Sequence, residues 1–456
     1  MGGMHAHVIL AAGQGTRMRS RLPKVLHPLL GKPMLLYALE AALALKPERL
    51  VVVVGHGGEK VVEALEGYPV EVAWQKEQLG TAHALLQAEG LLRDFPGPFL
   101  VTQGDTPLLS PRTLEALLRR VREGAGMALL TAELPDPTGY GRILREGEEV
   151  LGNVEEKDAP PEVRAIREVN AGAYAFDGFR FQALKEVRNE NAAREYYLPD
   201  LVAIYRAHGR RVLAVRGVAE EALGVNTREE LARVEGVLLR RLRAEWMGKG
   251  VRMILPETIY LEPSVELAPD VTLWPGAVLK GKTRIGEGCE VGPYAVLEDT
   301  VLEPGAKVLA HTVAQGAHLH PGASAGPFAR LRPGAVLMEE VHVGNFVEVK
   351  NSLLHKGVKA GHLAYLGDAE VGEGTNIGAG VITANYDGKR KHKTEIGKKA
   401  FIGSNSVLVA PVRVGDRALV GAGSVITQDV PEGALAVARE RQKNLEGYAL
   451  RKLGEG

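Results

Sequence analysis

The sequence predicts two domains of different architecture, an α/β domain followed by a parallel β-helix. In the first half, short continuous apolar runs alternate with helical patterns, which is typical of a mostly parallel sheet covered by helices. After about residue 255, aliphatic residues recur every six positions, a period that fits neither a helix nor an alternating strand.

Length and composition set the limits of this interpretation. The chain has 456 residues, which is enough for two or three domains. Its 56 basic and 56 acidic residues balance to a formal net charge of zero, which argues against nucleic acid as a partner. Cys289 is the single cysteine, so no internal disulfide framework is possible. We find no signal-peptide or membrane-spanning pattern and therefore expect a cytoplasmic protein without a membrane partner.

Three predicted strands of the first half end in glycine-rich or acidic segments. Residues 8–10, 50–54 and 99–102 are the apolar runs, and Gly13, Gly55 and Asp105 follow them closely. Ligands of parallel α/β sheets bind at the carboxyl ends of the strands. We therefore expect a ligand site where these segments meet.

A helix is predicted to join the two domains. Thr227 and Glu230 have the spacing of a capping box, in which the threonine hydroxyl accepts from the Glu230 N–H. Apolar residues then follow at helical spacing until Gly248 and Gly250. The predicted boundaries are an N-terminal domain over 1–226, a linking helix over 227–250 and a C-terminal domain over 251–456.

The six-residue period indicates a triangular solenoid in which each hexapeptide forms one short face. The aliphatic residue of each face points to the axis, and neighbouring coils must stack to bury it. Between Ile377 and Ile396 the period is broken by one extra residue, and a basic loop is expected to leave the solenoid there. The three frames are Leu261, Leu267, Leu273, Leu279, Ile285, Val291 and Leu297; Val313, Leu319, Ala325, Leu331, Leu337, Val343 and Val349; and Ile396, Ile402, Leu408, Val414, Val420 and Ile426.

The first strand is followed by the string Leu10-Ala11-Ala12-Gly13-Gln14-Gly15-Thr16-Arg17-Met18, with Pro23-Lys24 shortly after. Glycines and small residues let backbone N–H groups approach phosphates closely. Arg17 and Lys24 can neutralise the charge of a triphosphate during phosphoryl transfer, so we expect them to be catalytic. The whole string resembles the signature of sugar-phosphate nucleotidyltransferases, whose domain is a Rossmann-like α/β fold.

This resemblance assigns further residues of the first domain. Asp105 and Asn226 match the family's Mg²⁺ ligands, and a carboxylate at the end of a strand suits that ion; for an isolated Asp105, a helix N-cap is the alternative. Gln75 lies in the nucleobase-reading segment, where its amide can both donate and accept. The residues that the resemblance places around UTP or the sugar are Leu10, Ala11, Ala12, Gly13, Lys24, Gln75, Gly80, Thr81, Gln103, Gly104, Asp105, Gly141, Glu155, Asn170 and Asn226.

The second domain carries candidates for acyl transfer. Transfer from a thioester to an amine needs a base, and His362, with an ordinary pKa of ~6.5, is suited to that task near neutral pH. Segments 328–334, 343–348, 361–368, 376–380 and 385–388 together resemble the bifunctional N-acetylglucosamine-1-phosphate uridylyltransferase / glucosamine-1-phosphate N-acetyltransferase family. The resemblance covers nearly the whole chain and implies a left-handed parallel β-helix of hexapeptide repeats.

What the resemblance implies for this domain is an N-acetyltransferase that acts before the uridylyltransferase. His362 would be its catalytic base. Glucosamine-1-phosphate, acetyl-CoA and UTP would be the substrates, and three chains would form a homotrimer that shares its sites. The sugar-phosphate ligands would be Arg332, Lys350, Tyr365 and Asn376, and the acetyl-CoA ligands Ala379, Asn385, Tyr386, Ser404, Ala422 and Arg439.

Two positions depart from the family pattern. Gln103 stands where tyrosine is common and Gln14 where lysine is common, which bears on nucleotide affinity. An alternative hypothesis keeps the nucleotidyltransferase and makes the β-helix non-catalytic, as in ADP-glucose pyrophosphorylases. A third makes the chain a scaffold. The presence of His362 and Lys350 argues against a non-catalytic β-helix. The presence of Asp105 and Lys24 argues against a scaffold.

Overall fold

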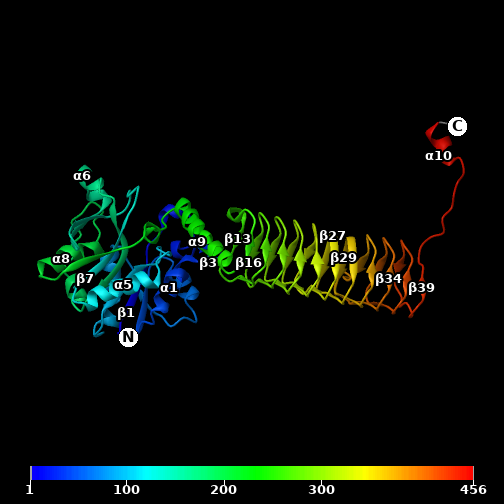
Figure 1. Cartoon of the computed structure of the whole chain (residues 1–456), viewed down its shortest axis with the longest axis horizontal. Helices are drawn as coiled ribbons and strands as arrows, with labels where there is room; N and C mark the ends of the chain where they lie inside the picture. Colours follow the sequence, from blue (N-terminus) through cyan, green and yellow to red (C-terminus); the bar gives the residue numbers. More distant parts are fainter. Residues whose placement is uncertain (1–2, 455–456) are drawn as a thin grey trace. The chain divides into compact units, whose positions relative to one another are not determined.

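The computed structural model describes residues 3–454 and divides the chain into two compact units, residues 1–238 and 239–456. The division falls inside helix α9 (Arg228–Gly248), which lies where the linking helix was predicted. Figure 1 shows a sheet with helices in the first unit and a stack of short strands in the second. Within residues 3–454, no helix is both long and apolar enough to cross a membrane.

The first unit is built on a nine-stranded sheet with the order β5-β4-β1-β6-β10-β7-β11-β9-β8. The three predicted strands are confirmed as β1, β4 and β6, and together with β5 they run parallel. Strand β10 is antiparallel to both β6 and β7, so the remainder of the sheet is mixed. The strands are β1 (Ala6–Ala11), β4 (Arg49–Val54), β5 (Glu71–Trp74), β6 (Phe99–Gln103), β7 (Met127–Glu133), β8 (Arg142–Glu146), β9 (Glu149–Val154), β10 (Glu168–Phe176) and β11 (Val212–Arg216), with β2 (Pro28–Leu29) and β3 (Lys32–Pro33) in a separate ribbon.

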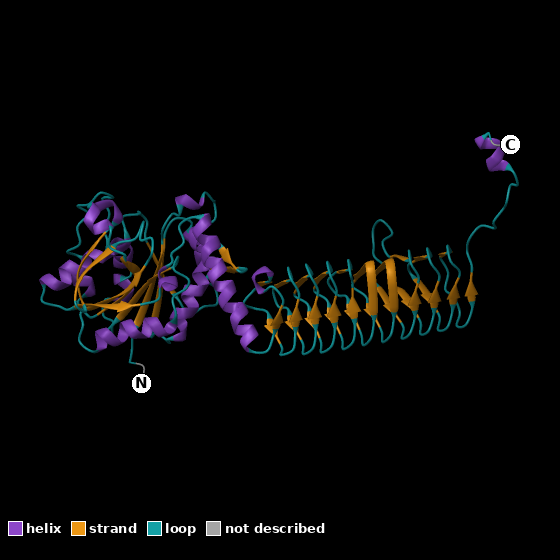
Figure 2. Ribbon diagram, turned by 45° about the horizontal axis from the view of Figure 1, so that its top comes forward, coloured by secondary structure: helices purple, strands orange, loops and turns teal. Residues whose placement is uncertain are grey.

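Helices cover this sheet (Figure 2), and the longer ones, such as α1 and α5, bury apolar residues in its core. In α5, Ser110 caps the first turn by accepting from the Thr113 N–H at 3.2 Å, and Leu114, Leu117 and Val121 face the core. The helices of the unit are α1 (Met34–Ala44), α2 (Gly58–Ala64), α3 (Thr81–Leu86), α4 (Glu89–Leu92), α5 (Pro111–Arg122), α6 (Pro161–Arg164), α7 (Arg180–Leu184) and α8 (Leu201–Ala207).

Helix α9 starts as the sequence predicts. The Thr227 hydroxyl accepts from the Glu230 N–H at 3.1 Å, and the Glu230 carboxylate lies 3.1 Å from the same hydroxyl. Val234 and Val237 are buried in the core of the first unit. The last turns of the helix belong to the second unit, where Trp246 packs against the β-helix core.

The second unit is the predicted parallel β-helix. Its coils pair in parallel ladders, one of nine strands and one of nineteen. The nine are β14 (Glu266–Leu267), β17 (Arg284–Ile285), β20 (Val301–Leu302), β23 (His318–Leu319), β26 (Val336–Leu337), β28 (Leu353–Leu354), β30 (Ala369–Val371), β33 (Thr394–Ile396) and β36 (Val412–Val414). The nineteen are β12 (Arg252–Met253), β13 (Tyr260–Leu261), β15 (Thr272–Leu273), β16 (Val278–Lys280), β18 (Glu290–Val291), β19 (Val296–Glu298), β21 (Lys307–Val308), β22 (Val313–Gln315), β24 (Ser324–Ala325), β25 (Arg330–Leu331), β27 (His342–Lys350), β29 (Lys359–Gly367), β31 (Asn376–Ile377), β32 (Ile382–Ala384), β34 (Phe401–Ile402), β35 (Val407–Val409), β37 (Leu419–Val420), β38 (Val425–Ile426) and β39 (Leu435–Ala436). A short helix, α10 (Tyr448–Leu453), follows the last coil.

The predicted axial residues are buried with one exception. Leu279, Leu297, Ala314 and Leu331 stack in register on consecutive coils. Val313 is 45 % exposed, so its placement on the axis was wrong, and Ala314 takes that position. The reason is that the coil from Ala314 to Leu331 advances 17 residues, one fewer than three hexapeptides, so counting back six from Leu319 reaches Val313 instead of Ala314.

The predicted basic loop leaves the solenoid between β32 and β33 (Figure 2). Its turn is held by Asp387, whose carboxylate accepts from the backbone N–H groups of Lys389 and Arg390 and lies 2.7 Å from His392 Nε2. The Arg390 N–H, the His392 side chain and the Lys389 N–H lower the pKa of Asp387 to about 2. The loop is therefore a formed turn with a fixed charge.

The buried residues that stack along the axis of the β-helix lead to a prediction about stability. Replacing the fully buried Leu297 by alanine is expected to cost about 2–5 kcal/mol of unfolding free energy, because it leaves a cavity between coils. The matched change Val313→Ala removes an exposed side chain and is expected to cost less than about 1 kcal/mol. Urea unfolding followed by circular dichroism measures both, and equal losses would contradict the assigned register.

Candidate active sites

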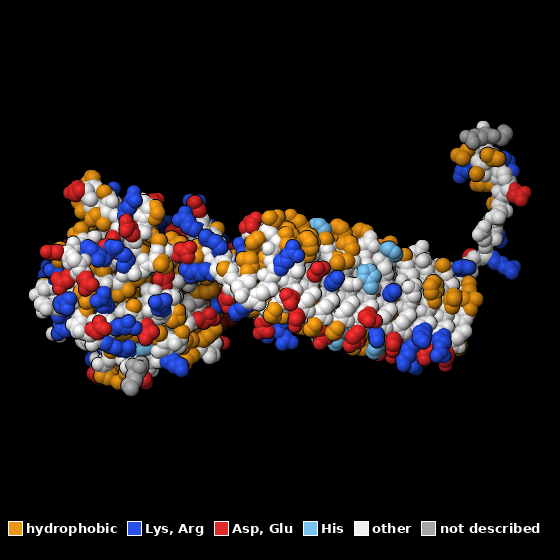
Figure 3. Space-filling model, in the orientation of Figure 1, with side chains coloured by type: hydrophobic (Ala, Val, Ile, Leu, Met, Phe, Trp, Pro, Cys, Tyr) orange, Lys and Arg blue, Asp and Glu red, His pale blue; other side chains and the backbone are white. Residues whose placement is uncertain are grey.

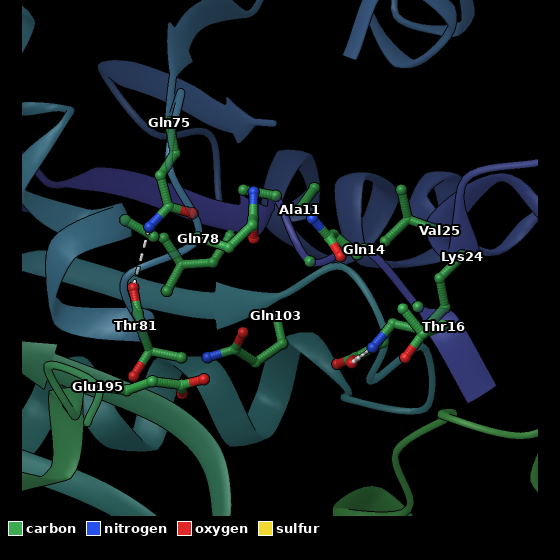
Figure 4. A pocket seen from close by; sticks show the side chains of 17 residues that line it. Ala11, Gln14, Thr16, Lys24, Val25, Gln75, Gln78, Thr81, Gln103 and Glu195 are labelled. Carbon is green, nitrogen blue, oxygen red and sulfur yellow. Dashed lines mark hydrogen bonds and ion pairs between the residues drawn. The ribbon is translucent and has the colours of Figure 1, made fainter. Parts of the chain in front are cut away.

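A cavity of about 370 Å³ lies at the carboxyl ends of β1 and β6 in the first unit. In Figure 4, Gln75, Gln78 and Thr81 lie toward one end of the cavity and Lys24 and Thr16 toward the other, with Gln103 between them. Ten predicted residues line it: Leu10, Ala11, Ala12, Gly13, Lys24, Gln75, Gly80, Thr81, Gln103 and Asp105.

The glycine-rich turn after β1 is shaped by close contacts. Gly15 has a φ of +66°, and a Cβ there would lie 2.6 Å from Lys24 Cβ. Any side chain at this position would therefore be strained and would displace Lys24. The turn and the lysine form one packed unit at the edge of the cavity.

Lys24 is held between the two predicted metal ligands. Its Nζ lies 2.7 Å from Asp105 Oδ2 and 2.9 Å from Asn226 Oδ1, which brings together residues from three distant segments. A carboxylate oxygen and an amide oxygen that converge on one cation form the hard donor set that suits Mg²⁺. The arrangement is a site for positive charge at the Lys24 end of the cavity.

The opposite end is organised by Gln75, which is 3 % exposed. Its Nε2 donates to the Gly80 carbonyl at 3.1 Å and lies 2.9 Å from His83 Nδ1. Thr81 Oγ1 accepts from the Leu198 N–H at 2.8 Å. The contacts of Nε2 fix the orientation of the Gln75 amide. An amide held in this way can form directional hydrogen bonds with a planar ligand.

The predicted sugar-binding residues lie beside this cavity and do not line it. A Cβ on Gly141 would lie 2.9 Å from Glu155 Oε1, so these two residues are neighbours. Burial raises the pKa of Glu155, against the hydrogen bond of 2.9 Å that it accepts from Asn153. The Asn170 amide already forms a hydrogen bond within the protein, because its Nδ2 donates to the Tyr174 hydroxyl at 2.7 Å.

Two further predicted residues, Arg17 and Gly104, do not line the cavity. Arg17, in the 3-10 helix η1 (Thr16–Met18), is exposed and does not line the cavity. Gly104 lies behind the cavity wall, where its N–H donates to the Leu10 carbonyl at 2.8 Å. A Cβ on Gly104 would lie 3.0 Å from Val25, so its contribution is backbone packing.

The cavity also contains residues that were not assigned from the sequence. Glu195 reaches it because the Tyr196 N–H donates to the Leu79 carbonyl at 2.8 Å and the Tyr196 carbonyl accepts from Ala82. No local sequence pattern marks this long-range pairing. The unassigned lining residues are Gln14, Gly15, Thr16, Val25, Gln78, Ala84 and Glu195.

In the second unit, the two longest strands carry the predicted base. Strands β27 and β29 each span nine residues, and their register places Asn345 opposite His362. His362 Nδ1 lies 3.1 Å from Asn345 Oδ1, so Nδ1 is the protonated nitrogen of the neutral ring and Nε2 carries the free lone pair. The exposed His362 side chain can therefore accept a proton from a ligand on this surface.

Cationic side chains gather on the same coils. Arg332 lies opposite Lys350, because the Arg332 N–H donates to the Val349 carbonyl at 2.8 Å. Lys350 also lies beside Lys391 of the basic loop, and its ammonium group lowers the pKa of Lys391. The like charges of Lys350 and Lys391 favour an anion such as a phosphate between them, and Arg332 lies on the preceding coil with its Nη1 3.7 Å from Glu348 Oε2.

Tyr365 and Asn385, which the resemblance assigns to different substrates, lie side by side. Asn385, 7 % exposed, places Nδ2 at 3.3 Å from the Tyr365 hydroxyl and 2.7 Å from Asp368 Oδ2. Burial opposes ionisation of Asp368, but hydrogen bonds from Asn351 and Asn385 keep the pKa of its carboxyl below the ordinary value. Asp368 was not assigned from the sequence as a site residue, and it fixes the Asn385 amide.

The predicted acetyl-CoA residues follow one line along later coils. The Ala379 carbonyl accepts from the Asn405 N–H at 2.8 Å, next to Ser404, and the Ser404 carbonyl accepts from Gly423, next to Ala422. Arg439 Nη1 donates to the Ala422 carbonyl at 2.6 Å. Tyr386 is exposed on the basic loop, and Asn376 is exposed on β31.

Comparison with known proteins shows the same two-part organisation. Residues 7–162 match the MobA-like NTP transferase domain, and residues 393–428 match the bacterial transferase hexapeptide model of six repeats. With the parallel ladders, the hexapeptide match identifies the second unit as the left-handed β-helix expected.

Full-length relatives are found as well. The bifunctional protein GlmU of Halalkalibacterium halodurans is 48 % identical over 449 residues, covering 98 % of each chain. GlmU of an Anaeromyxobacter species is 50 % identical over 456 residues, covering 99 % of this chain and 93 % of its own. The chain therefore belongs to the GlmU family of bifunctional proteins, which confirms the resemblance of its motifs to a uridylyltransferase joined to an N-acetyltransferase.

Proposed function

We propose that the chain makes UDP-N-acetylglucosamine in two steps at two separate sites. The β-helix acetylates glucosamine-1-phosphate with acetyl-CoA, and the N-terminal cavity then transfers uridylyl from UTP to N-acetylglucosamine-1-phosphate. The observation that carries this proposal is the convergence of Lys24, Asp105 and Asn226 at one end of a cavity whose other end presents Gln75.

For uridylyl transfer, the cavity orients two anionic substrates. A phosphate oxygen of the sugar phosphate forms a bond to the α-phosphorus of UTP while the bond to pyrophosphate breaks. Lys24, with the more exposed Arg17, balances the charge that develops, and Gln75 holds the uracil edge. Asp105 and Asn226 would hold Mg²⁺, which supplies further positive charge at the phosphates.

The sugar of the acceptor is proposed to lie near Gly141, Glu155 and Asn170. A side chain at position 141 would collide with Asn153 and Glu155, so the glycine lets these two side chains keep their positions. The partly desolvated Glu155 carboxylate is an acceptor for sugar hydroxyl groups, and hydrogen bonds to it are stronger than in water. Asn170 would have to exchange its bond with Tyr174 for one with the ligand.

For acetyl transfer, His362 Nε2 takes the proton as the amine of glucosamine-1-phosphate attacks the thioester carbonyl. The new bond is the amide C–N bond, the C–S bond breaks, and CoA leaves as the thiol. Asn345 keeps the ring oriented, while Arg332 and Lys350 bind the sugar phosphate. Tyr365 and Asn376 would hold the amino sugar, and the line from Ala379 to Arg439, with Asn385 and Tyr386, would hold acetyl-CoA.

We also propose that three chains assemble through the β-helix in the cytoplasm, with residues 1–226 and 251–456 as the two catalytic domains. In support, hydrophobic side chains gather along the β-helix over the strands from β13 to β27 (Figure 3). At one corner the rings of Tyr294, His311, Phe328 and Phe346 stack with centroid distances of 5.4, 4.8 and 5.8 Å. Phe328 and Phe346 are 50 % and 59 % exposed, as an interface between chains would require.

Asp105→Ala is expected to lower the rate of uridylyl transfer by about 10³-fold, because the carboxylate that helps to hold positive charge at the phosphates is lost. Acetyl transfer should stay within twofold of the unmodified protein. Pyrophosphate release and CoA-thiol release measure the two reactions separately. Asp136→Ala, which removes an exposed carboxylate of the same unit, is the control and should leave both rates unchanged.

His362→Ala is expected to produce the opposite pattern. Acetyl transfer should fall by about 10²–10⁴-fold, as for the loss of a general base, while uridylyl transfer is retained. Asn345→Ala should give a smaller loss and shift the pH profile of acetyl transfer, because the ring would no longer be held in one tautomer. A folded His362→Ala protein that acetylates normally would remove His362 from the mechanism.

The assembly is tested by light scattering. The unmodified protein should have three times the mass of the 48.9 kDa chain, and a Phe328→Asp, Phe346→Asp double variant should have a lower mass. Charges at the exposed ring column would be desolvated in an interface, which disfavours association. A monomeric unmodified protein would contradict the proposed trimer.

A further inference from the structure

A cluster of two histidines and a glutamate lies on one face of the β-helix, outside every residue assigned to the two reactions. His318 and His320 flank the buried Leu319, and the alternation of a strand places both imidazoles on the outer face. Glu303 follows β20 on the preceding coil and lies beside His320, because the Glu303 N–H donates to the Leu319 carbonyl at 2.9 Å.

The ligand atoms of the three side chains converge. Glu303 Oε2 lies 2.5 Å from His320 Nδ1 and 3.5 Å from His318 Nε2. The three atoms all lie within 4.8 Å of one another, and the two rings stack with centroids 4.4 Å apart at 6°. Among the described residues, this is the one group of three His, Cys, Asp or Glu side chains with such spacing.

An ordinary ion pair does not account for this geometry. Glu303 Oε2 and His318 Nε2 are both shielded from solvent, and neither has a hydrogen-bond partner of acceptable geometry. Leaving such atoms unsatisfied is unfavourable, because each has given up its hydrogen bonds to water without replacing them. By contrast, His355 Nε2 and Glu370 Oε1 on later coils form a normal hydrogen-bonded pair at 3.0 Å.

We propose that Glu303, His318 and His320 bind one divalent transition-metal ion of the chemistry of Zn²⁺. Two imidazole nitrogens and one carboxylate oxygen are a ligand set that Zn²⁺ accepts, whereas Mg²⁺ and Ca²⁺ prefer oxygen ligands throughout. A metal ion bound by both would satisfy the two shielded atoms at once.

The surroundings leave room for a further ligand on the ion. Glu303 and His318 border a hollow of about 400 Å³, which is also lined by Glu266 and Arg284. Three protein ligands leave a position of a four-coordinate ion free for water or a small anion.

The consequence for the protein is a link between two coils. Glu303 belongs to one coil and both histidines to the next, so the ion would join neighbours that are otherwise connected by the backbone ladder and the core. In a solenoid each coil is stabilised by its neighbours, so a link at one interface opposes local separation of the coils.

The test uses the untagged full-length protein in millimolar Mg²⁺, which occupies the oxygen-rich site at Asp105. Competition with a chromophoric chelator should give one tightly bound Zn²⁺ per chain, and Co²⁺ should give the visible absorption of a four-coordinate ion. His318→Gln and His320→Gln should each weaken Zn²⁺ binding by at least about tenfold and abolish the Co²⁺ bands. Glu303→Gln, which leaves both imidazoles, should weaken binding as well.

His355→Gln is the matched control, because it removes a histidine from a His–Glu pair of the same face without touching the cluster. It should bind Zn²⁺ and Co²⁺ as the unmodified protein does, and Zn²⁺ should raise the melting temperature of this variant but not of His320→Gln. An unmodified protein without Co²⁺ bands would overturn the proposal. So would tight Zn²⁺ binding that survives His318→Gln combined with His320→Gln.

Discussion

Each coil of the β-helix can bury its aliphatic side chains only against the next coil, and this constraint positions the functional groups of the second unit. Stacking fixes the register of successive coils, as in the column Leu279, Leu297, Ala314 and Leu331. Side chains that point outward are then held at the same register. Asn345 meets His362 in this way, so a core constraint becomes a pairing of polar side chains at the surface.

In the first unit, the topology of the sheet brings the functional groups together. Parallel strands end at one edge of the sheet, so loops that are far apart in the sequence meet there. Three such segments supply Lys24, Asp105 and Asn226. The side-chain oxygens of the last two converge on the Lys24 ammonium group. Asn170 lies on β10, which is antiparallel to β6, and Glu155 directly follows β9, so these predicted sugar-binding residues lie beside the cavity and do not line it.

Much of this could be predicted because it depends on local patterns. The strand ends, the Thr227 cap and the hexapeptide frames follow from neighbouring residues, and the structure contains them. Val313 was assigned to the axis wrongly because a coil can lose one residue at a corner, which the period alone does not reveal. Glu195 was missed because a backbone pairing between Tyr196 and Leu79 brings it to the cavity. The Glu303–His318–His320 cluster depends on the same coil register, which a linear pattern does not display.

The central claim is that one chain holds two separate sites that act in succession. Mixing Asp105→Ala with His362→Ala tests it most directly. With glucosamine-1-phosphate, acetyl-CoA and UTP, neither variant alone should form UDP-N-acetylglucosamine, whereas the mixture should form it after a lag while N-acetylglucosamine-1-phosphate accumulates. A mixture that stays inactive, although each variant retains its own half-reaction, would contradict the account.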